Sequence, residues 1–338
     1  MKLQTWFNEN DYLQKFKKYG VQYRKYPELD LMIIKRSYGS NYSEKKFWLN
    51  YCRGLIINYK TNDIVFIPPV KAKECNTDEI FTKLGGSPKP LVDGTMVNLF
   101  YYKDQWLLAT RSNIGAKNKW VGDKSFSDMF QECSQNLDIS QLNTNRTYSF
   151  VMRHKKNRLT SKIYKNELVL VEVYDKLSRL TCLPENEGYS CIDKWIPDEL
   201  FKGLTVTINK TRYKWITNEH KFIEMIKPNT NNPLLSYLKL RNSGHLTQYL
   251  RYFPEQRFEY DKYRNKLHQI SKLLYQCYVS VFIQKSINKE DIPYHLKPLL
   301  YEIHGEYLNQ RQGISWEYIK NYIYELEPKR LCFVMNNL

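Results

Sequence analysis

Two hydrophobic periodicities divide the chain: a strand-like pattern in the first two thirds and a helix-like pattern after about residue 228. In the first part, short apolar runs alternate with polar turns, and three pairs of runs have the pattern of antiparallel strand pairs. These pairs are residues 54–58 with 63–67, residues 97–102 with 105–110, and residues 147–152 with 167–174. We expect the members of each pair to be neighbours in an antiparallel sheet.

One helix is predicted inside this strand-rich part. It begins near Ser125 or Ser127, either of which can cap a first turn through its hydroxyl oxygen. From about Pro228 onward, apolar residues recur at i, i+3 and i+4, and prolines separate the segments. The pattern predicts an α+β fold with an antiparallel-sheet domain over residues 1–225 and an all-helical domain over residues 226–338.

The charge balance favours an anionic partner. The 338 residues include 52 Lys and Arg against 35 Asp and Glu, a formal net charge of +17. Such a surplus is typical of proteins that bind nucleic acid or an anionic membrane. A hydrophobic fraction of 42% is sufficient for a packed core and excludes a disordered chain.

The sequence shows no pattern of membrane insertion or secretion. No apolar run approaches the roughly 18 residues of a spanning helix, and the first residues lack the cationic and apolar segments of a secretory signal. We therefore expect a soluble, cytoplasmic protein without a membrane partner.

Neither the seven cysteines nor the six histidines have the spacing of metal ligands. The cysteines are scattered and include no C-x-x-C pair, so we interpret them as reduced thiols. The chain also lacks a G-x-x-x-x-G-K-(S/T) loop and a G-x-S-x-G elbow. The sequence thus predicts no metal site, and it excludes these phosphate-binding and hydrolase motifs.

The most informative segment is L-V-D-G-T at residues 91–95, followed by an apolar run and then by T-R-S at residues 110–112. It resembles the covalent nucleotidyltransferases, specifically the phage-type ATP-dependent RNA ligases. In that family a K-x-D-G-(S/T) motif precedes a strand hairpin and a T-R-(G/S) segment follows it. The motif lysine of active members attacks the α-phosphate of ATP and forms a lysyl-AMP intermediate. Here Leu91 stands at the position of that lysine.

Upstream, C-R-G at residues 52–54 is similar to the family strand whose arginine contacts the nucleotide phosphate, and this resemblance gives that role to Arg53. Lys71 and Lys73 lie where the family places a basic residue near the same phosphate. The resemblance also includes Asp93, Gly94 and Arg111 in the nucleotide or RNA-end site.

Downstream, residues 148–158 resemble the family's F-E-x-x-x-x-x-N-R segment, with Val151 at the position of the glutamate. Residues 202–205 resemble its E-G-x-V motif with Lys202 in place of the glutamate, and Glu187-Gly188 is an alternative match further from Lys214. Residues 212–216 resemble the final K-x-K motif, of which only Lys214 is kept.

These departures predict a site that fits a nucleotide or an RNA end but does not adenylylate itself. No catalytic residue is assigned. Lys89 is the one alternative nucleophile, but it lies two residues before Leu91, about 7 Å along a strand, with Pro90 between them. No cofactor is expected to be required. A bound nucleotide of the ATP or GTP class is compatible with the site, and Mg²⁺ would be needed only by an active enzyme.

Basic residues outside the motifs are interpreted as RNA-backbone contacts, although a solvated charged face has the same pattern. They come from the basic run at residues 153–158, from the segment at residues 202–205, and from helical segments in which basic and aromatic residues alternate. They are Arg153, Lys155, Lys156, Arg158, Lys202, Lys239, Arg241 and Arg251.

Three functions remain open at this point. The first is an inactive RNA-ligase-like protein that holds a nucleotide, an RNA 5′ end or an mRNA cap. The second is an active RNA ligase or guanylyltransferase-like enzyme that uses a displaced lysine. The third is a basic RNA-binding subunit of a larger RNA-processing or translation complex, with protein partners.

Overall fold

The structure is a computed structural model that describes residues 2–9, 11–37, 46–76, 88–119, 122–175, 181–182, 201–208 and 211–337. The chain forms two compact units, residues 1–221 and 222–338. The Glu187-Gly188 match lies outside the described residues.

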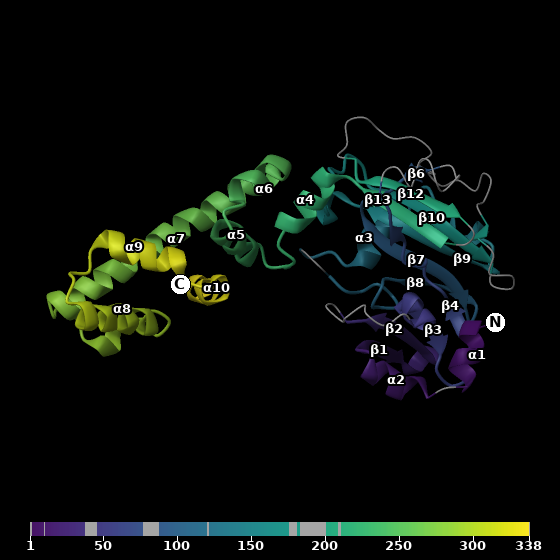
Figure 1. Ribbon diagram of the computed structural model, residues 1–338, viewed down its shortest axis with the longest axis horizontal. Helices are drawn as coiled ribbons and strands as arrows, with labels where there is room; N and C mark the ends of the chain where they lie inside the picture. The colour runs from purple at the N-terminus through teal and green to yellow at the C-terminus, as the bar shows by residue number, and fades with distance from the viewer. Residues whose placement is uncertain are drawn as a thin grey trace. The chain divides into compact units, whose positions relative to one another are not determined.

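The first unit begins with two short helices and a four-stranded antiparallel sheet (Figure 1). Phe7 of the first helix and Phe16 of the second pack with Ile34 and Leu55 on one face of that sheet. The elements are α1 (Lys2–Glu9), α2 (Tyr12–Lys18), β1 (Val21–Tyr26), β2 (Leu31–Arg36), β3 (Arg53–Asn58) and β4 (Ile64–Phe66), and the strand order is β1-β2-β3-β4. The first expected hairpin, now β3 and β4, is confirmed.

A five-stranded antiparallel sheet forms the centre of the unit. Lys103 and Asp104 connect two of its strands, and both have the positive φ that a tight hairpin turn requires. The strands are β7 (Thr95–Tyr102), β8 (Gln105–Ala109), β9 (Arg146–Arg153), β10 (Glu167–Asp175) and β11 (Thr181–Cys182), in the order β11-β10-β9-β7-β8. The second and third expected strand pairs are both confirmed.

The two faces of this central sheet pack against different partners. Helix α3 (Phe126–Cys133) covers one face, and of the two predicted caps it is Ser125 that caps it, in a capping box with Asp128. On the other face, Phe100 stacks on Phe66 of the first sheet at a centroid distance of 5.6 Å. The apolar core therefore extends from α3 through both sheets.

A third sheet collects segments that are far apart in the sequence. Its order is β5-β13-β12-β6, and only the β5–β13 pair is parallel. The strands are β5 (Lys73–Glu74), β6 (Lys89–Pro90), β12 (Gly203–Ile208) and β13 (Thr211–Ile216). Three motif-like segments of the sequence therefore meet in one small sheet.

The second unit is helical, which confirms the α+β class and its order along the chain. Helix α4 (Asn218–Ile226) crosses the boundary between the units. The others are α5 (Pro233–Asn242), α6 (Leu246–Tyr252), α7 (Arg257–Tyr278), α8 (Lys297–Gln310), α9 (Trp316–Glu325) and α10 (Pro328–Asn336). Among the described residues, every helix is too short or too polar to cross a bilayer.

Candidate functional site

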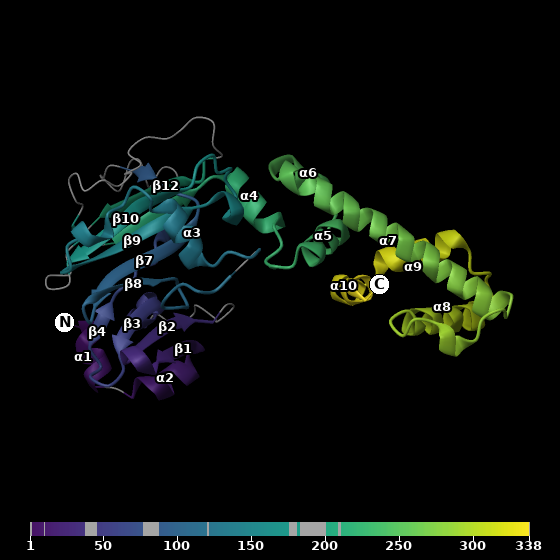
Figure 2. The ribbon, with the colours of Figure 1, turned by 180° about the vertical axis from the view of Figure 1, so that it is seen from behind.

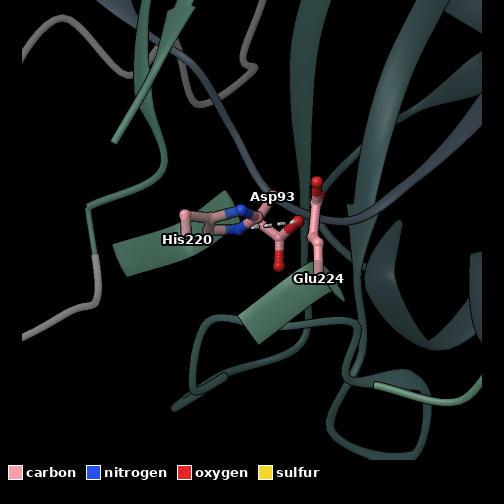
Figure 3. A group of neighbouring side chains, drawn as sticks. All are labelled: Asp93, His220 and Glu224. Atoms are coloured by element: carbon pink, nitrogen blue, oxygen red, sulfur yellow. Dashed lines mark ion pairs between the residues drawn. The ribbon is translucent and has the colours of Figure 1, made fainter. Parts of the chain in front are cut away.

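Asp93, the aspartate of the D-G motif, lies in the interior, and both of its carboxylate oxygens contact polar groups of the protein. Oδ2 accepts hydrogen bonds from the backbone amides of Thr160 and Ser161, each at 2.9 Å. Oδ1 lies 2.7 Å from the Lys202 ammonium and 3.7 Å from Nε2 of His220. Figure 3 shows the His220 ring beside this carboxylate; Glu224, also drawn, is one turn further along α4.

The charge state of Asp93 follows from these contacts. Burial by itself would raise its pKa, but the neighbouring His220 ring and the charge of Lys202 hold the pKa well below its usual range. The carboxylate is therefore ionised and already neutralised by an ammonium group. A metal ion at Oδ1 would have to displace Lys202, so we assign none there.

The backbone around Leu91 is held by the third sheet. The Leu91 amide donates a hydrogen bond to the carbonyl of Gly203 at 2.8 Å. Gly94 lies so close to β9 that an added Cβ would be 2.6 Å from the Met152 carbonyl and 2.7 Å from Val151. Residues 91–94 thus lie against two other motif-like segments: Lys202-Gly203, and β9 around Val151.

The expected phosphate-side lysines lie along the third sheet. Lys214 forms an ion pair of 3.1 Å with Glu74, and Lys73 lies 5.9 Å from the ring centroid of Tyr213. Lys71 is exposed. Lys89 is exposed on β6, where it pairs in register with Thr205.

The backbone of Arg111, which follows β8 of the central sheet, lies beside Gly54, the neighbour of Arg53 on β3 of the first sheet. An added Cβ at Gly54 would lie 3.2 Å from the Cα of Arg111, so the C-R-G and T-R-S segments touch. Arg53 is the cross-strand partner of Lys35 on β2. The structure thereby brings together two segments that the family resemblance placed in the nucleotide or RNA-end site.

A groove of about 610 Å³ lies beside this pair of segments. Its walls are β1, β2 and the chain that follows Arg111, and none of the polar side chains that line it is acidic. Those side chains are Gln22, Tyr23, Arg24, Lys35, Ser112, Asn113 and Asn118. Arg24 and Lys35 are the two cations of this lining.

The sequence pattern did not reveal Arg24 and Lys35. Strand β1 is exposed from Gln22 to Lys25, so it lacks the alternation of buried and exposed residues that identifies a strand. Only the pairing of β1 with β2 turns these residues toward the segment after Arg111.

A buried acidic group was also missed. Glu172 on β10 lies 3.3 Å from the Arg212 guanidinium on β13 and accepts a hydrogen bond from Tyr174. Burial raises the pKa of Glu172, while the charge of Arg212 acts in the opposite direction. Like Asp93, this interior carboxylate is paired with a cation from residues 202–216.

Three of the expected RNA-backbone residues are not surface cations, and this corrects the sequence interpretation. Arg153 is 3% exposed and forms an ion pair of 2.7 Å with Glu167. Lys202 is held by Asp93. Arg241 is half-buried; its guanidinium lies 3.8 Å from the ring centroid of Tyr324 and donates to that residue's carbonyl.

The other expected RNA contacts differ in exposure. Lys155 and Lys156 are exposed on a 3₁₀ turn, and Arg251 is exposed at the end of α6. Arg158 is partly buried and donates two hydrogen bonds to the Thr160 carbonyl, and Lys239 is partly buried on α5.

No family model matches the chain, and no curated protein matches it. Among solved structures, the chain is similar to a "putative ATP-dependent DNA ligase" from Aquifex aeolicus, with a TM-score of 0.43 and 14% sequence identity. The match covers 81% of this chain and 77% of that chain.

Proposed function

We propose that the protein is a catalytically inactive, RNA-ligase-like protein that binds RNA and holds a nucleotide, a 5′ end or a cap in the first unit. One observation carries the proposal: Lys202 is ion-paired with Asp93, while Leu91 occupies the position of the nucleophile. A leucine side chain cannot form a phosphoramide. The Asp93 carboxylate of the D-G motif is bound to a cation of the same protein.

The charge distribution supports binding of an anionic ligand without catalysis of nucleotide transfer. Both interior carboxylates of the region, Asp93 and Glu172, are paired with basic residues. Arg24 and Lys35 line one groove, Lys35 is the cross-strand partner of Arg53, and the backbone of Arg111 lies beside Gly54. A terminal phosphate is the ligand that best matches this arrangement.

We expect no covalent nucleotide adduct, even after the missing lysine is restored. In Leu91→Lys, the acidic groups that the family resemblance requires at positions 151 and 202 are still absent. Incubation with α-labelled ATP or GTP and Mg²⁺, followed by denaturing electrophoresis, should label neither the wild type nor this variant. An active RNA ligase labelled in parallel is the positive control.

A labelled wild-type band that disappears in Lys89→Arg would contradict this expectation. It would show an active enzyme with a displaced nucleophile.

We expect Arg111→Ala and Lys35→Ala each to weaken binding of a 5′-phosphorylated RNA about tenfold, since each removes a charge-assisted contact to phosphate. The measurement is fluorescence anisotropy with a labelled 12-nucleotide RNA at two salt concentrations. Lys17→Ala removes the same charge from the exposed side of α2 and should change the affinity less than about twofold.

Removal of the 5′ phosphate from the RNA should have the same effect as either variant, and the two changes should not add. Full additivity would place the terminal phosphate elsewhere. Equal affinity for capped and uncapped RNA of one sequence would exclude the cap as the ligand.

A further inference from the structure

Helix α7 presents a long solvent-exposed face in the second unit. Its buried residues, among them Tyr260, Leu267 and Leu274, lie on one side. In both views α5, α8 and α10 lie on one side of this helix (Figure 2). The opposite side carries exposed residues at helical spacing: Phe258, Lys262, Asn265, Gln269, Lys272 and Gln276.

Phe258 is the unusual member of this face. Its side chain is 73% exposed, more than that of any other large hydrophobic residue among those described. The Lys262 ammonium lies 4.3 Å from the centroid of its ring, within the range of a cation–π interaction. The face therefore combines an exposed aromatic ring with a neighbouring cation.

The charge along this part of the chain has one sign. Between Asp261 and Glu290 the sequence contains no Asp or Glu, but it contains six Lys and Arg. They are Lys262, Arg264, Lys266, Lys272, Lys285 and Lys289. Arg264 forms an ion pair with Asp261, and the ammonium groups of Lys262 and Lys272 are on the exposed face.

We propose that this face of α7 binds single-stranded RNA, with an unpaired base stacked on Phe258 and the backbone phosphates near Lys262 and Lys272. The inference rests on the proposed RNA-binding function and adds the class of RNA and the surface that receives it. Cations along a groove or ridge combined with an exposed aromatic ring are the pattern of sequence-tolerant single-strand binding. A duplex keeps its bases stacked internally and gives such a ring no partner.

The test measures binding of the full chain to a fluorescent single-stranded RNA and to a hairpin of the same composition. Phe258→Ala should weaken single-strand binding about tenfold, whereas Phe258→Trp should preserve it, because an indole ring also stacks on a base. Phe333→Ala is the matched control: it removes another ring of the same unit, 54% exposed on α10, and should leave the affinity within about twofold.

Lys262→Gln should weaken binding and reduce the salt dependence by about one ion. The hairpin should bind more weakly than the single strand, and Phe258→Ala should barely affect it.

The outcomes separate this inference from the proposed function. If the wild type binds no RNA, the proposed function fails. If it binds RNA but Phe258→Ala and Phe333→Ala behave like the wild type, the RNA surface lies elsewhere and only the inference fails. If Phe258→Ala instead reduces binding to vesicles with anionic lipid while single-strand binding is unchanged, the face is a membrane surface and the inference is overturned.

Discussion

Replacement of Asp93 by Asn is expected to lower the free energy of unfolding of the first unit by about 3–5 kcal/mol. The change leaves the Lys202 ammonium, which is 17% exposed, without its carboxylate 2.7 Å away. It also weakens the two hydrogen bonds from Thr160 and Ser161, which now end on a neutral amide oxygen. Urea denaturation followed by tryptophan fluorescence measures the effect, because six of the seven tryptophans belong to residues 1–221.

A double-mutant cycle with Lys202→Met tests whether the ion pair is the cause. Each single change leaves one buried charge uncompensated, so both should destabilise the protein, and the double variant should be clearly more stable than the sum predicts. If the two losses of unfolding free energy simply added in the double variant, Asp93 and Lys202 would contribute to stability independently.

The pH dependence has a defined sign. Because the folded-state pKa of Asp93 lies below its ordinary value of 3.8, the ion pair stabilises the protein at every pH above that value. Its contribution is lost only as the pH falls below 3.8 toward the folded-state pKa. The stability difference between the wild type and Asp93→Asn should therefore be constant near neutral pH and decrease in acid.

Gly203→Ala is expected to lower the free energy of unfolding by about 3 kcal/mol or more. Gly203 has φ of +147°, and an added Cβ would lie 1.9 Å from the carbonyl oxygen of Trp215, which is a backbone atom of the paired strand. The strand cannot yield without loss of the β12–β13 pairing and of the hydrogen bond that the Leu91 amide donates to Gly203. The same urea titration measures the change.

Gly305→Ala provides the comparison. Gly305 lies within α8, and an added Cβ there meets no atom within 4 Å. Alanine should stabilise that helix by about 0.5–1 kcal/mol. A Gly203→Ala protein as stable as the wild type would show that β12 and β13 do not approach as described.

The pairs of strands and the cap of α3 could be predicted because their signals are local. The turn at Lys103 and Asp104 and the capping serine at 125 depend on neighbours within a few residues. The helical period of the second unit is equally local. By contrast, no pattern predicted β1, because its residues 22–25 are exposed and its place depends on β2.

The amino-acid sequence by itself determined the order of a strand-rich and a helical part, the surplus of positive charge, and the absence of a lysine at position 91. Only the tertiary structure decided which charges face a ligand and which are paired inside. Lys202 and Asp93 are 109 residues apart, and Arg153 and Arg241 look in the sequence like any surface cation. Burial and ion pairing arise from contacts between distant segments, which hydrophobic period and local spacing do not encode.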